Sequence, residues 1–321
     1  IQARRQLASG FKPILYAAGL KDGTMPCDYL SNEPVVLEDF QDWSPDNYDK
    51  NDEGGRYSMN AALSKSLNIP TLHLYFQVGH RKLNRLWEDF EFKVTLPDNP
   101  SAALGTAEGN MIEVARAYAA FANGGNLVEP YYISKITTKE GEVIYQHEVE
   151  QPKRVLSETE AQLMRQMLEK TVDAGTAIGL ASRFGVSLDL AGKTGTSQNY
   201  ADAWFNSFSS DLVLINRVGC ASPAVHFNSG NNGSGSALAL PLAGYFWKDI
   251  QATPSLKSTY AAGFNHSQDV AFDCEDYRPQ GLIDGVFNLF SKDKTTLEKE
   301  RRKAEVKQGI RKGIRSIFGD N

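Results

Sequence analysis

The amino-acid sequence predicts an α+β protein in which an antiparallel sheet is flanked by helices. Apolar residues recur at helical spacing through much of the first 172 positions, whereas short strand-like runs follow from residue 188 onward. Apart from one hairpin among the helices, helices and strands therefore occupy different parts of the chain. This segregation is typical of α+β domains and not of the regular alternation that builds parallel sheets.

Four segments carry helical patterns with recognisable ends. Pro13 stands in the first turn of the earliest one, and Asn68-Ile69-Pro70 interrupts the second. Asn123-Gly124-Gly125 ends the third, and Ser157 with Glu160 forms a capping box at the start of the fourth. Helices are expected over residues 12–18, 59–78, 111–121 and 157–172.

The strands are expected in two groups. Residues 131–137 and 143–145 flank a glycine turn and predict a β-hairpin, and three later runs, 188–196, 203–208 and 212–218, predict neighbouring strands. Two polar stretches, residues 22–55 and 228–236, are predicted to be loops. The first is long enough to form a wall of a binding site.

Composition is ordinary for a globular protein. Of the 321 residues, 41% are hydrophobic and 23% are charged, which suits one large domain. The formal net charge of −5 argues against nucleic acid as a partner, because nucleic-acid-binding proteins usually carry a basic surface. No stretch approaches the roughly 18 consecutive apolar residues that a membrane span requires.

The cysteines and histidines show no metal-site pattern. Cys27, Cys220 and Cys274 lie far apart in sequence without a C-x-x-C pair, so they predict neither a zinc site nor a disulfide framework. The five histidines show no ligand spacing. We therefore expect no metal ion and no organic cofactor.

Both ends of the sequence carry expectations of their own. The chain begins at Ile1 without an initiator methionine, which suggests a fragment of a longer protein. Residues 292–315 hold ten Lys or Arg against four Asp or Glu, and Val306, Ile310 and Ile314 share one helical face. A basic amphipathic helix is expected there, either as a solvated appendage or as a contact for anionic lipid or a partner.

The first chemical motif joins a serine and a lysine. Ser9 and Lys12 are three residues apart, so on a helix their side chains leave one face one turn apart. Serine attacks only when a base takes its proton, and lysine can do so only when its pKa is lowered toward neutrality. Ser291 and Lys294 share the spacing within a charged run, whereas an apolar helix follows Lys12. Ser9 is therefore the candidate nucleophile.

A second motif supplies a hydroxyl and a carboxamide. Ser66 and Asn68 fall at the helix junction, where they could relay a proton and hold a substrate amide. The same S-x-N pattern recurs elsewhere in the chain, so helix capping is the simplest interpretation of this motif by itself. Its position relative to the other motifs must decide whether it is a helix cap or part of an active site.

The strongest motif is Gly192-Lys193-Thr194-Gly195-Thr196, which occurs once and is expected to form an exposed edge strand. Lys193 would supply a second cation. The hydroxyls of Thr194 and Thr196 could bind a carboxylate, and Gly195 would let a substrate backbone approach closely.

S-x-x-K, S-x-N and K-T-G in this order resemble the active-site set of penicillin-binding proteins and serine β-lactamases. The flanking sequence is similar to the bifunctional, class A penicillin-binding proteins over roughly residues 1–250. The similarity is carried by Ser66-Leu67-Asn68-Ile69-Pro70-Thr71, Ala103-Leu104-Gly105-Thr106, Ala117-Tyr118-Ala119-Ala120-Phe121-Ala122-Asn123-Gly124-Gly125, and the K-T-G segment continuing to Asp202-Ala203-Trp204-Phe205. It implies a penicillin-binding protein/β-lactamase-like fold with a mostly helical subdomain, a transpeptidase domain over 1–253 and a C-terminal extension over 254–321.

The resemblance also implies roles for individual residues. Ser9 would be the acylated nucleophile, with Lys12 as its base and Ser66 as the proton relay. Catalytic residues would be Ser9, Lys12, Ser66 and Lys193, and substrate-binding residues Asn68, Thr194, Gly195 and Thr196. The backbone N–H groups of Ser9 and Thr196 would form the oxyanion hole. The turn at residues 173–177 resembles a family segment that lies near the cleft.

The implied activity is peptidoglycan D,D-transpeptidation. Stem peptides ending in D-Ala-D-Ala would be the substrates and β-lactams covalent inhibitors, at the outer face of the cytoplasmic membrane, with membrane attachment through an N-terminal segment of the longer protein. Two alternatives remain open, a hydrolytic D,D-carboxypeptidase or β-lactamase and a non-catalytic β-lactam sensor. A class A β-lactamase would need a glutamate before K-T-G, but Glu158 and Glu160 are better explained as helix capping.

Two departures from the family pattern stand out. The family usually has glycine before the nucleophile and a larger residue after it, whereas this chain has Ala8 and Gly10. A flexible Gly10 is expected to loosen the positioning of Ser9. Family members also have a strand and a helix before S-x-x-K, so part of the sheet is expected to be missing.

Overall fold

The central feature of the fold is an antiparallel sheet made by the strands predicted for the second half of the chain. The structure is a computed structural model that describes residues 1–49 and 54–279. The sheet order is β11-β10-β9, formed by β9 (Ala191–Thr196), β10 (Asp202–Phe208) and β11 (Val213–Gly219). Register places Thr194 opposite Phe205 and Lys193 opposite Asn206. The K-T-G strand therefore lies at an edge of this sheet.

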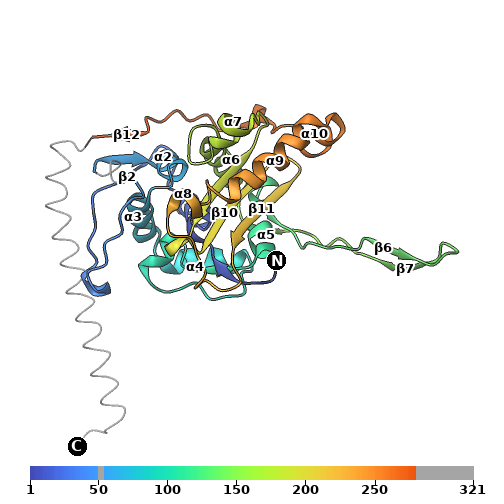
Figure 1. The fold of residues 1–321 in the computed structure, drawn as a ribbon, viewed down its shortest axis with the longest axis horizontal. Coiled ribbons are helices and arrows are strands. Elements are labelled where there is room, and N and C mark those ends of the chain that lie inside the picture. The colour runs from blue at the N-terminus through green and yellow to red at the C-terminus, as the bar shows by residue number, and fades with distance from the viewer. Residues whose placement is uncertain (50–53, 280–321) are drawn as a thin grey trace, which may run out of the picture. The chain divides into compact units, whose positions relative to one another are not determined.

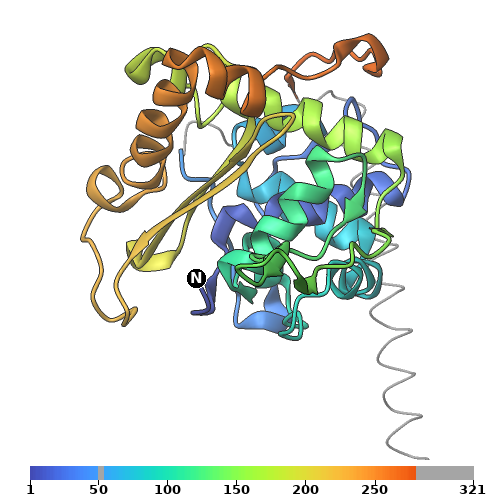
Figure 2. The ribbon, with the colours of Figure 1, turned by 90° about the vertical axis from the view of Figure 1, so that its right-hand side faces the viewer.

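Helices cover both faces of the sheet, as Figure 2 shows. One face packs on α5 (Met111–Ala122) and α6 (Glu158–Asp173), and the other on α9 (Ala239–Ala252), which in turn contacts α7 (Gly179–Phe184) and α10 (Pro254–Tyr260). Because side chains alternate along a strand, Trp204 and Phe208 join the first hydrophobic core whereas Ala203 and Phe205 join the second. The predicted layer arrangement is confirmed.

The other helices belong to the same core as α5 and α6. They are α1 (Lys12–Lys21), α2 (Met59–Ser64), α3 (Asn68–Val78) and α4 (His80–Asp89), preceded by the 3₁₀ turn η1 (Ala8–Gly10) and followed by η4 (Pro100–Leu104). The helical pattern is interrupted earlier than predicted. Helix α2 ends at Ser64 and α3 begins at Asn68, so Asn68, Ile69 and Pro70 form the first turn of α3 and not the break. The predicted capping box of Ser157 and Glu160 is present.

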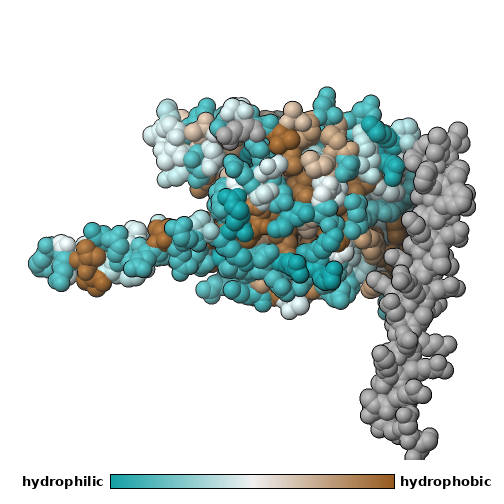
Figure 3. Space-filling view, turned by 180° about the vertical axis from the view of Figure 1, so that it is seen from behind, coloured by the Kyte–Doolittle hydropathy of each residue, from teal (hydrophilic) through white to brown (hydrophobic). Residues whose placement is uncertain are grey.

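The predicted hairpin projects from the body of the molecule (Figure 1). Its strands are β6 (Lys135–Thr137) and β7 (Val143–Gln146), and every residue in them is exposed. Apolar side chains lie along the arm, seen as brown patches in Figure 3. They include Tyr132, Ile133, Ile136, Val143, Ile144 and Val149.

Short elements complete the described chain, including parts of the two predicted loops. Short strands are β1 (Arg5–Gln6), β2 (Tyr29–Ser31), β3 (Arg56–Ser58), β4 (Glu108–Gly109), β5 (Asn126–Leu127), β8 (Lys153–Arg154) and β12 (Tyr277–Arg278). Short helical turns are α8 (Gly230–Gly233), η2 (Glu38–Phe40), η5 (Gln198–Tyr200) and η6 (His266–Gln268). The segments predicted as loops therefore hold β2, η2 and α8.

A disulfide joins Cys27 to Cys274, which are 247 residues apart in sequence and 5.2 Å apart at Cα. The expectation that the cysteines form no disulfide framework was wrong for this pair, because sequence spacing does not reveal contacts between distant segments. The segment before Cys274 lies along α6, where Gln166 Nε2 donates to Val270 O at 3.1 Å. Cys220 is free and exposed.

The C-terminal expectations have mixed outcomes. Residues 1–277 form one compact unit, so the described chain packs together past residue 253, and the domain boundary expected there stays a prediction. The basic helix expected within 292–315 lies outside the described residues. Among the described helices, none has both the length and the apolar character needed to cross a membrane.

Candidate active site

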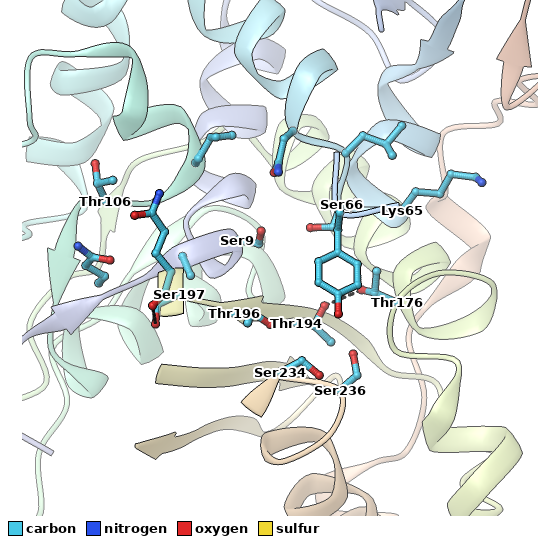
Figure 4. A pocket seen from close by; sticks show the side chains of 18 of the residues that line it. Ser9, Lys65, Ser66, Thr106, Thr176, Thr194, Thr196, Ser197, Ser234 and Ser236 are labelled. Carbon is cyan, nitrogen blue, oxygen red and sulfur yellow. Dashed lines mark hydrogen bonds between the residues drawn. The ribbon is translucent and has the colours of Figure 1, made fainter. Parts of the chain in front are cut away.

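A cavity of about 420 Å³ opens where η1, the α2–α3 junction and β9 meet. Figure 4 shows Ser9 near its centre, with Ser66, Thr194 and Thr196 around it. The lining residues are Gln6, Ala8, Ser9, Trp43, Tyr48, Asp49, Lys65, Ser66, Leu67, Asn68, Ser101, Leu104, Gly105, Thr106, Thr176, Thr194, Thr196, Ser197, Gln198, Ser234 and Ser236. The structure thus brings the three sequence motifs to one place.

Ser9 sits in the 3₁₀ turn η1, immediately before α1. A hydrogen bond to a distant segment fixes this turn, since Ala8 N donates to Gly105 O at 2.9 Å. Ala8 has a φ of +49°, a left-handed conformation that favours glycine, which gives a physical reason for the glycine usual at this position in the family. The Ser9 hydroxyl makes no hydrogen bond with another described residue and lines the cavity.

Gly10 is held more firmly than its sequence context suggests. Its N–H donates to Leu7 O at 3.0 Å, and its carbonyl accepts from the Tyr118 hydroxyl at 3.0 Å. A Cβ on this glycine would lie 3.0 Å from Asn206 Nδ2. These contacts contradict the expected loosening around the nucleophile, because the backbone after Ser9 is fixed on several sides.

Lys12 begins α1 and is completely buried. Its Nζ donates to Ser66 O at 2.7 Å and Asn68 Oδ1 at 2.8 Å, and lies 3.4 Å from Ser66 Oγ. Burial lowers the pKa of this amine well below its ordinary value, and the nearby Lys193 lowers it further. The neutral amine, with its lone pair, is therefore easier to reach for Lys12 than for an exposed lysine.

Ser66 lies between two lysine amines. Lys193 Nζ donates to Ser66 Oγ at 2.8 Å, on the hydroxyl that Lys12 also approaches. Ser66 has a φ of +60°, which is unusual for a serine and occurs where the surrounding structure imposes it. Its hydroxyl is consequently directed at both amines and reaches the cavity.

Asn68 is fixed by the polar loop before α2. Its carboxamide accepts from Lys12 Nζ and donates through Nδ2 to Asp46 O at 2.8 Å. Asn47 Oδ1 in turn accepts from the backbone N–H groups of Asn68 and Ile69, at 2.8 and 3.1 Å. Asn47 thus satisfies the first donors of α3 from a distant loop, a link that sequence reasoning missed.

Strand β9 provides two kinds of side chain. Lys193 is completely buried, and this burial lowers its pKa to about 7. Thr194 and Thr196 share the alternate side of the strand and line the cavity. The strand was expected to be exposed, but residues 191–195 are buried, because α6 and η1 pack against this edge.

The Cα of Gly195 packs closely against the backbone of the Ser9 turn. A Cβ at this position would lie 3.0 Å from Gly10 N and 3.2 Å from Leu7 O. Any larger residue would push on the turn that carries Ser9. This contact provides a reason for glycine here that differs from close approach by a substrate backbone.

Thr176 and the Ser234–Ser236 segment complete the cavity wall beside Thr194 and Thr196. Gly235 N donates to Thr196 Oγ1 at 3.0 Å. The turn at residues 173–177 was expected near the cleft on family resemblance, and its Thr176 does line the cavity. Ser234 and Ser236 carry no local sequence signal beyond the glycine-rich composition around them.

Among the described residues, one histidine and two carboxylates gather in a group outside the cavity. Glu169, His266 and Asp269 lie close enough to share an ion, although Glu169 is too distant in sequence to suggest this grouping. Arg165 pairs with both carboxylates. The group is therefore an ion-pair network in which the guanidinium of Arg165 neutralises the two carboxylates.

The fold and the order of the motifs place the chain in one class of proteins. These are the active-site serine proteins that share the penicillin-binding protein and β-lactamase fold. The family model described as penicillin binding protein transpeptidase domain matches residues 1–210. The chain belongs to this family. Penicillin-binding protein 1A from Neisseria lactamica is 34% identical over 254 residues, and that from Neisseria gonorrhoeae 31% over 290 residues.

The alignments cover most of this chain but only a part of each relative. The two alignments include 75% and 86% of this chain but 31% and 34% of the relatives, so the chain spans about a third of their length. Among solved structures, penicillin-binding protein 1A from Haemophilus influenzae superposes with a TM-score of 0.71 at 24% identity, covering 85% of this chain and 44% of that one. Penicillin-binding protein A from M. tuberculosis, as a penicillin G acyl-enzyme complex, gives 0.66 at 20% identity over 78% and 62% of the two chains. These structures show the shared fold.

Proposed function

We propose that the chain is a peptidoglycan D,D-transpeptidase that works through an acyl-enzyme on Ser9. The observation that carries this proposal is the convergence of Lys12 and Lys193 on the Ser66 hydroxyl, at 3.4 and 2.8 Å, beside Ser9 in one cavity. Two buried amines with lowered pKa values around a hydroxyl form a proton-transfer system without histidine.

The first half-reaction transfers the acyl group to the enzyme. Ser9 Oγ attacks the carbonyl carbon between the last two D-alanines, while Lys12 Nζ takes the hydroxyl proton. The C–N bond breaks, and a proton relayed through Ser66 reaches the departing amine of D-alanine. The products are an ester on Ser9 and free D-alanine, and the lysine regains its neutral form.

The second half-reaction forms the cross-link. An amine of a neighbouring stem peptide attacks the ester carbonyl, and its proton returns through the same groups to Ser9 Oγ. The N–H groups of Ser9 and Thr196 are proposed to stabilise the oxyanion in both steps. Asn68 is proposed to hold a donor amide, while Thr194 and Thr196 hold the terminal carboxylate from the strand that Gly195 keeps close to η1.

The lining of the cavity favours this activity over that of a class A β-lactamase. Asp49 is the one carboxylate among the described lining residues. Glu160, one of the two glutamates considered from sequence, accepts instead from Ser157 N at 2.8 Å as part of the helix cap. A glutamate placed to activate water against the ester is therefore lacking within the described wall.

Partners and location follow from the family and the relatives. We propose stem peptides as substrates and β-lactams as covalent inhibitors, in line with the penicillin G acyl-enzyme of the M. tuberculosis neighbour. We place the activity in the cell envelope at the outer face of the cytoplasmic membrane. The relatives are about three times as long as the matched segment, and we propose that the full-length protein attaches to the membrane through an N-terminal segment.

Labelling with fluorescent penicillin tests the nucleophile. Wild-type chain should retain the label through denaturing electrophoresis, and Ser9→Ala should lose it. Ser291→Ala is the matched control, because Ser291 stands in the other S-x-x-K sequence. A label that persists in Ser9→Ala would contradict the assignment, and its loss in Ser291→Ala would then identify Ser291 as the acylated residue.

A donor peptide ending in D-Ala-D-Ala, supplied with an acceptor amine, tests the reaction. Mass spectrometry should detect both released D-alanine and the cross-linked product. Released D-alanine without cross-linked product identifies a carboxypeptidase, and rapid turnover of nitrocefin identifies a β-lactamase. Stable acylation with neither product identifies a sensor.

A further inference from the structure

A hydroxyl outside the three motifs contacts the K-T-G strand inside the cavity. Thr176 Oγ1 lies 2.6 Å from Thr194 Oγ1, within the normal range for a hydrogen bond between hydroxyls. Figure 4 shows the two side chains facing each other at the side of the cavity away from Thr106. Thr176 follows α6 and is partly exposed into the cavity.

Backbone contacts fix the position of Thr176. Its N–H donates to Ser64 O at 3.2 Å, and the next N–H, of Ala177, donates to Thr171 O at 3.0 Å. A Cβ on Gly175 would lie 2.4 Å from Ser64 O, so only glycine allows the turn to approach α2 this closely. The Thr176 hydroxyl is thus held by packing between α2 and α6, independently of β9.

The direction of hydrogen bonding in the pair decides what Thr194 can bind. Each hydroxyl has one hydrogen and two lone pairs. When Thr176 donates to Thr194, the hydrogen of Thr194 is free to point at a ligand. When Thr194 donates to Thr176, it presents only lone pairs to the cavity, which repel a carboxylate.

The neighbouring threonine has the same arrangement with a backbone donor. Thr196 Oγ1 accepts from Gly235 N, which also leaves the Thr196 hydrogen for the cavity. Lys65 is the one cationic side chain among the described lining residues, so hydroxyl hydrogens are the main donors on this wall. Their direction therefore determines whether the wall attracts or repels an anion.

We propose that Thr176 is a positioning residue for the terminal carboxylate of the donor peptide. Its hydroxyl donates to Thr194, and Thr194 donates to the carboxylate, so that binding orders both hydrogens in one chain. In such a chain each hydrogen bond polarises the next and strengthens it. The last bond ends on a charged acceptor, and hydrogen bonds to charged groups are the strongest kind. The proposal rests on the proposed function, because it assumes a ligand that ends in a carboxylate.

Equilibrium binding separates this role from a structural one. In a Ser9→Ala background, which removes acylation, a peptide ending in D-Ala-D-Ala and its C-terminal amide are titrated by NMR. Thr176→Val keeps the shape of the side chain and removes the hydroxyl. It should weaken binding of the carboxylate peptide by up to roughly tenfold, the loss expected for one hydrogen bond between neutral groups. Binding of the amide should change less than about twofold, and Thr176→Ser should restore carboxylate binding.

Controls and contrary outcomes are defined by the same titration. Thr259→Val, on α10 with a hydroxyl bonded to Ser255 O, should leave both affinities unchanged. Equal weakening of the carboxylate and amide peptides by Thr176→Val would show a packing role and overturn the proposal. An unchanged affinity for the carboxylate peptide would overturn it as well. Failure of the proposed function is recognised separately, as wild-type chain that takes no penicillin label on Ser9.

Discussion

Strand β9 and the hairpin β6–β7 are both antiparallel strand structures, yet they have opposite surroundings. In β9, five of the six residues are buried, from Ala191 to Gly195. In β6 and β7 every residue is exposed, although several are apolar. The alternation of side chains is the same in both, so the difference comes from the elements packed around them and not from local sequence.

The contrast explains where chemistry can occur. Burial removes water from Lys193 and lowers its pKa to about 7. Packing from α6 and η1 also fixes the direction of each β9 side chain. The hairpin has no such support, and mutations there should behave as surface changes.

The largest expected effect comes from removing the buried amine that we propose as the base. Lys12→Met keeps the length of the side chain and removes the amine, so acylation of Ser9 by fluorescent penicillin should slow by roughly 10²–10⁴-fold. Lys21→Met, at the exposed far end of the same helix, is the control and should label at the wild-type rate. Wild-type labelling of Lys12→Met would show that another group accepts the proton.

The next largest effect concerns the segment around Cys274, which, unlike the hairpin, is covalently linked to the rest of the fold through Cys27. Replacing Cys27 and Cys274 together by serine should lower the free energy of unfolding by about 2–4 kcal/mol, because the disulfide closes a very long loop. Urea denaturation measures the change. Cys220→Ser serves as control, since this exposed thiol is free. Equal stability of the double variant and the wild type would mean that packing alone holds the segment.

A pH effect should distinguish buried from exposed lysines. An unfolded lysine keeps its proton up to a pKa of about 10.5, but folded Lys193 keeps it only to about 7. Between these values the unfolded chain binds more protons, so the contribution of Lys193 to the free energy of unfolding rises with pH and is lost as pH falls toward 7. Denaturation at pH 7, 8 and 9 should show this rise, and Lys193→Met should reduce it. An identical pH dependence in the variant would refute the lowered pKa.

The smallest effect is expected on the hairpin. Ile144→Lys replaces an exposed apolar residue and should change the free energy of unfolding by no more than about 0.5 kcal/mol. Phe208→Ala, in the buried strand next to β9, should cost about 3–5 kcal/mol by comparison. Thermal denaturation of both variants measures the contrast. A large loss in Ile144→Lys would show that the arm packs on something in solution.

The sequence alone predicted most of the local elements and named the candidate reactive groups. Capping residues such as Ser157 and Glu160 fixed helix starts, and glycine turns fixed the hairpin, because these signals act within a few residues. The order of S-x-x-K, S-x-N and K-T-G predicted which side chains meet. It did not say how they meet.

Tertiary structure decided the geometry and the environment of the site. Lys12 reaches Ser66 across 54 residues, Lys193 reaches it across 127, and the two cysteines meet across 247. Such contacts depend on the packing of whole helices and strands, which a local pattern does not encode. For the same reason the burial of β9, the contact of Gly195 with η1 and the hydroxyl pair at Thr176 became visible only in the folded chain, where desolvation and close packing set the chemistry of each group.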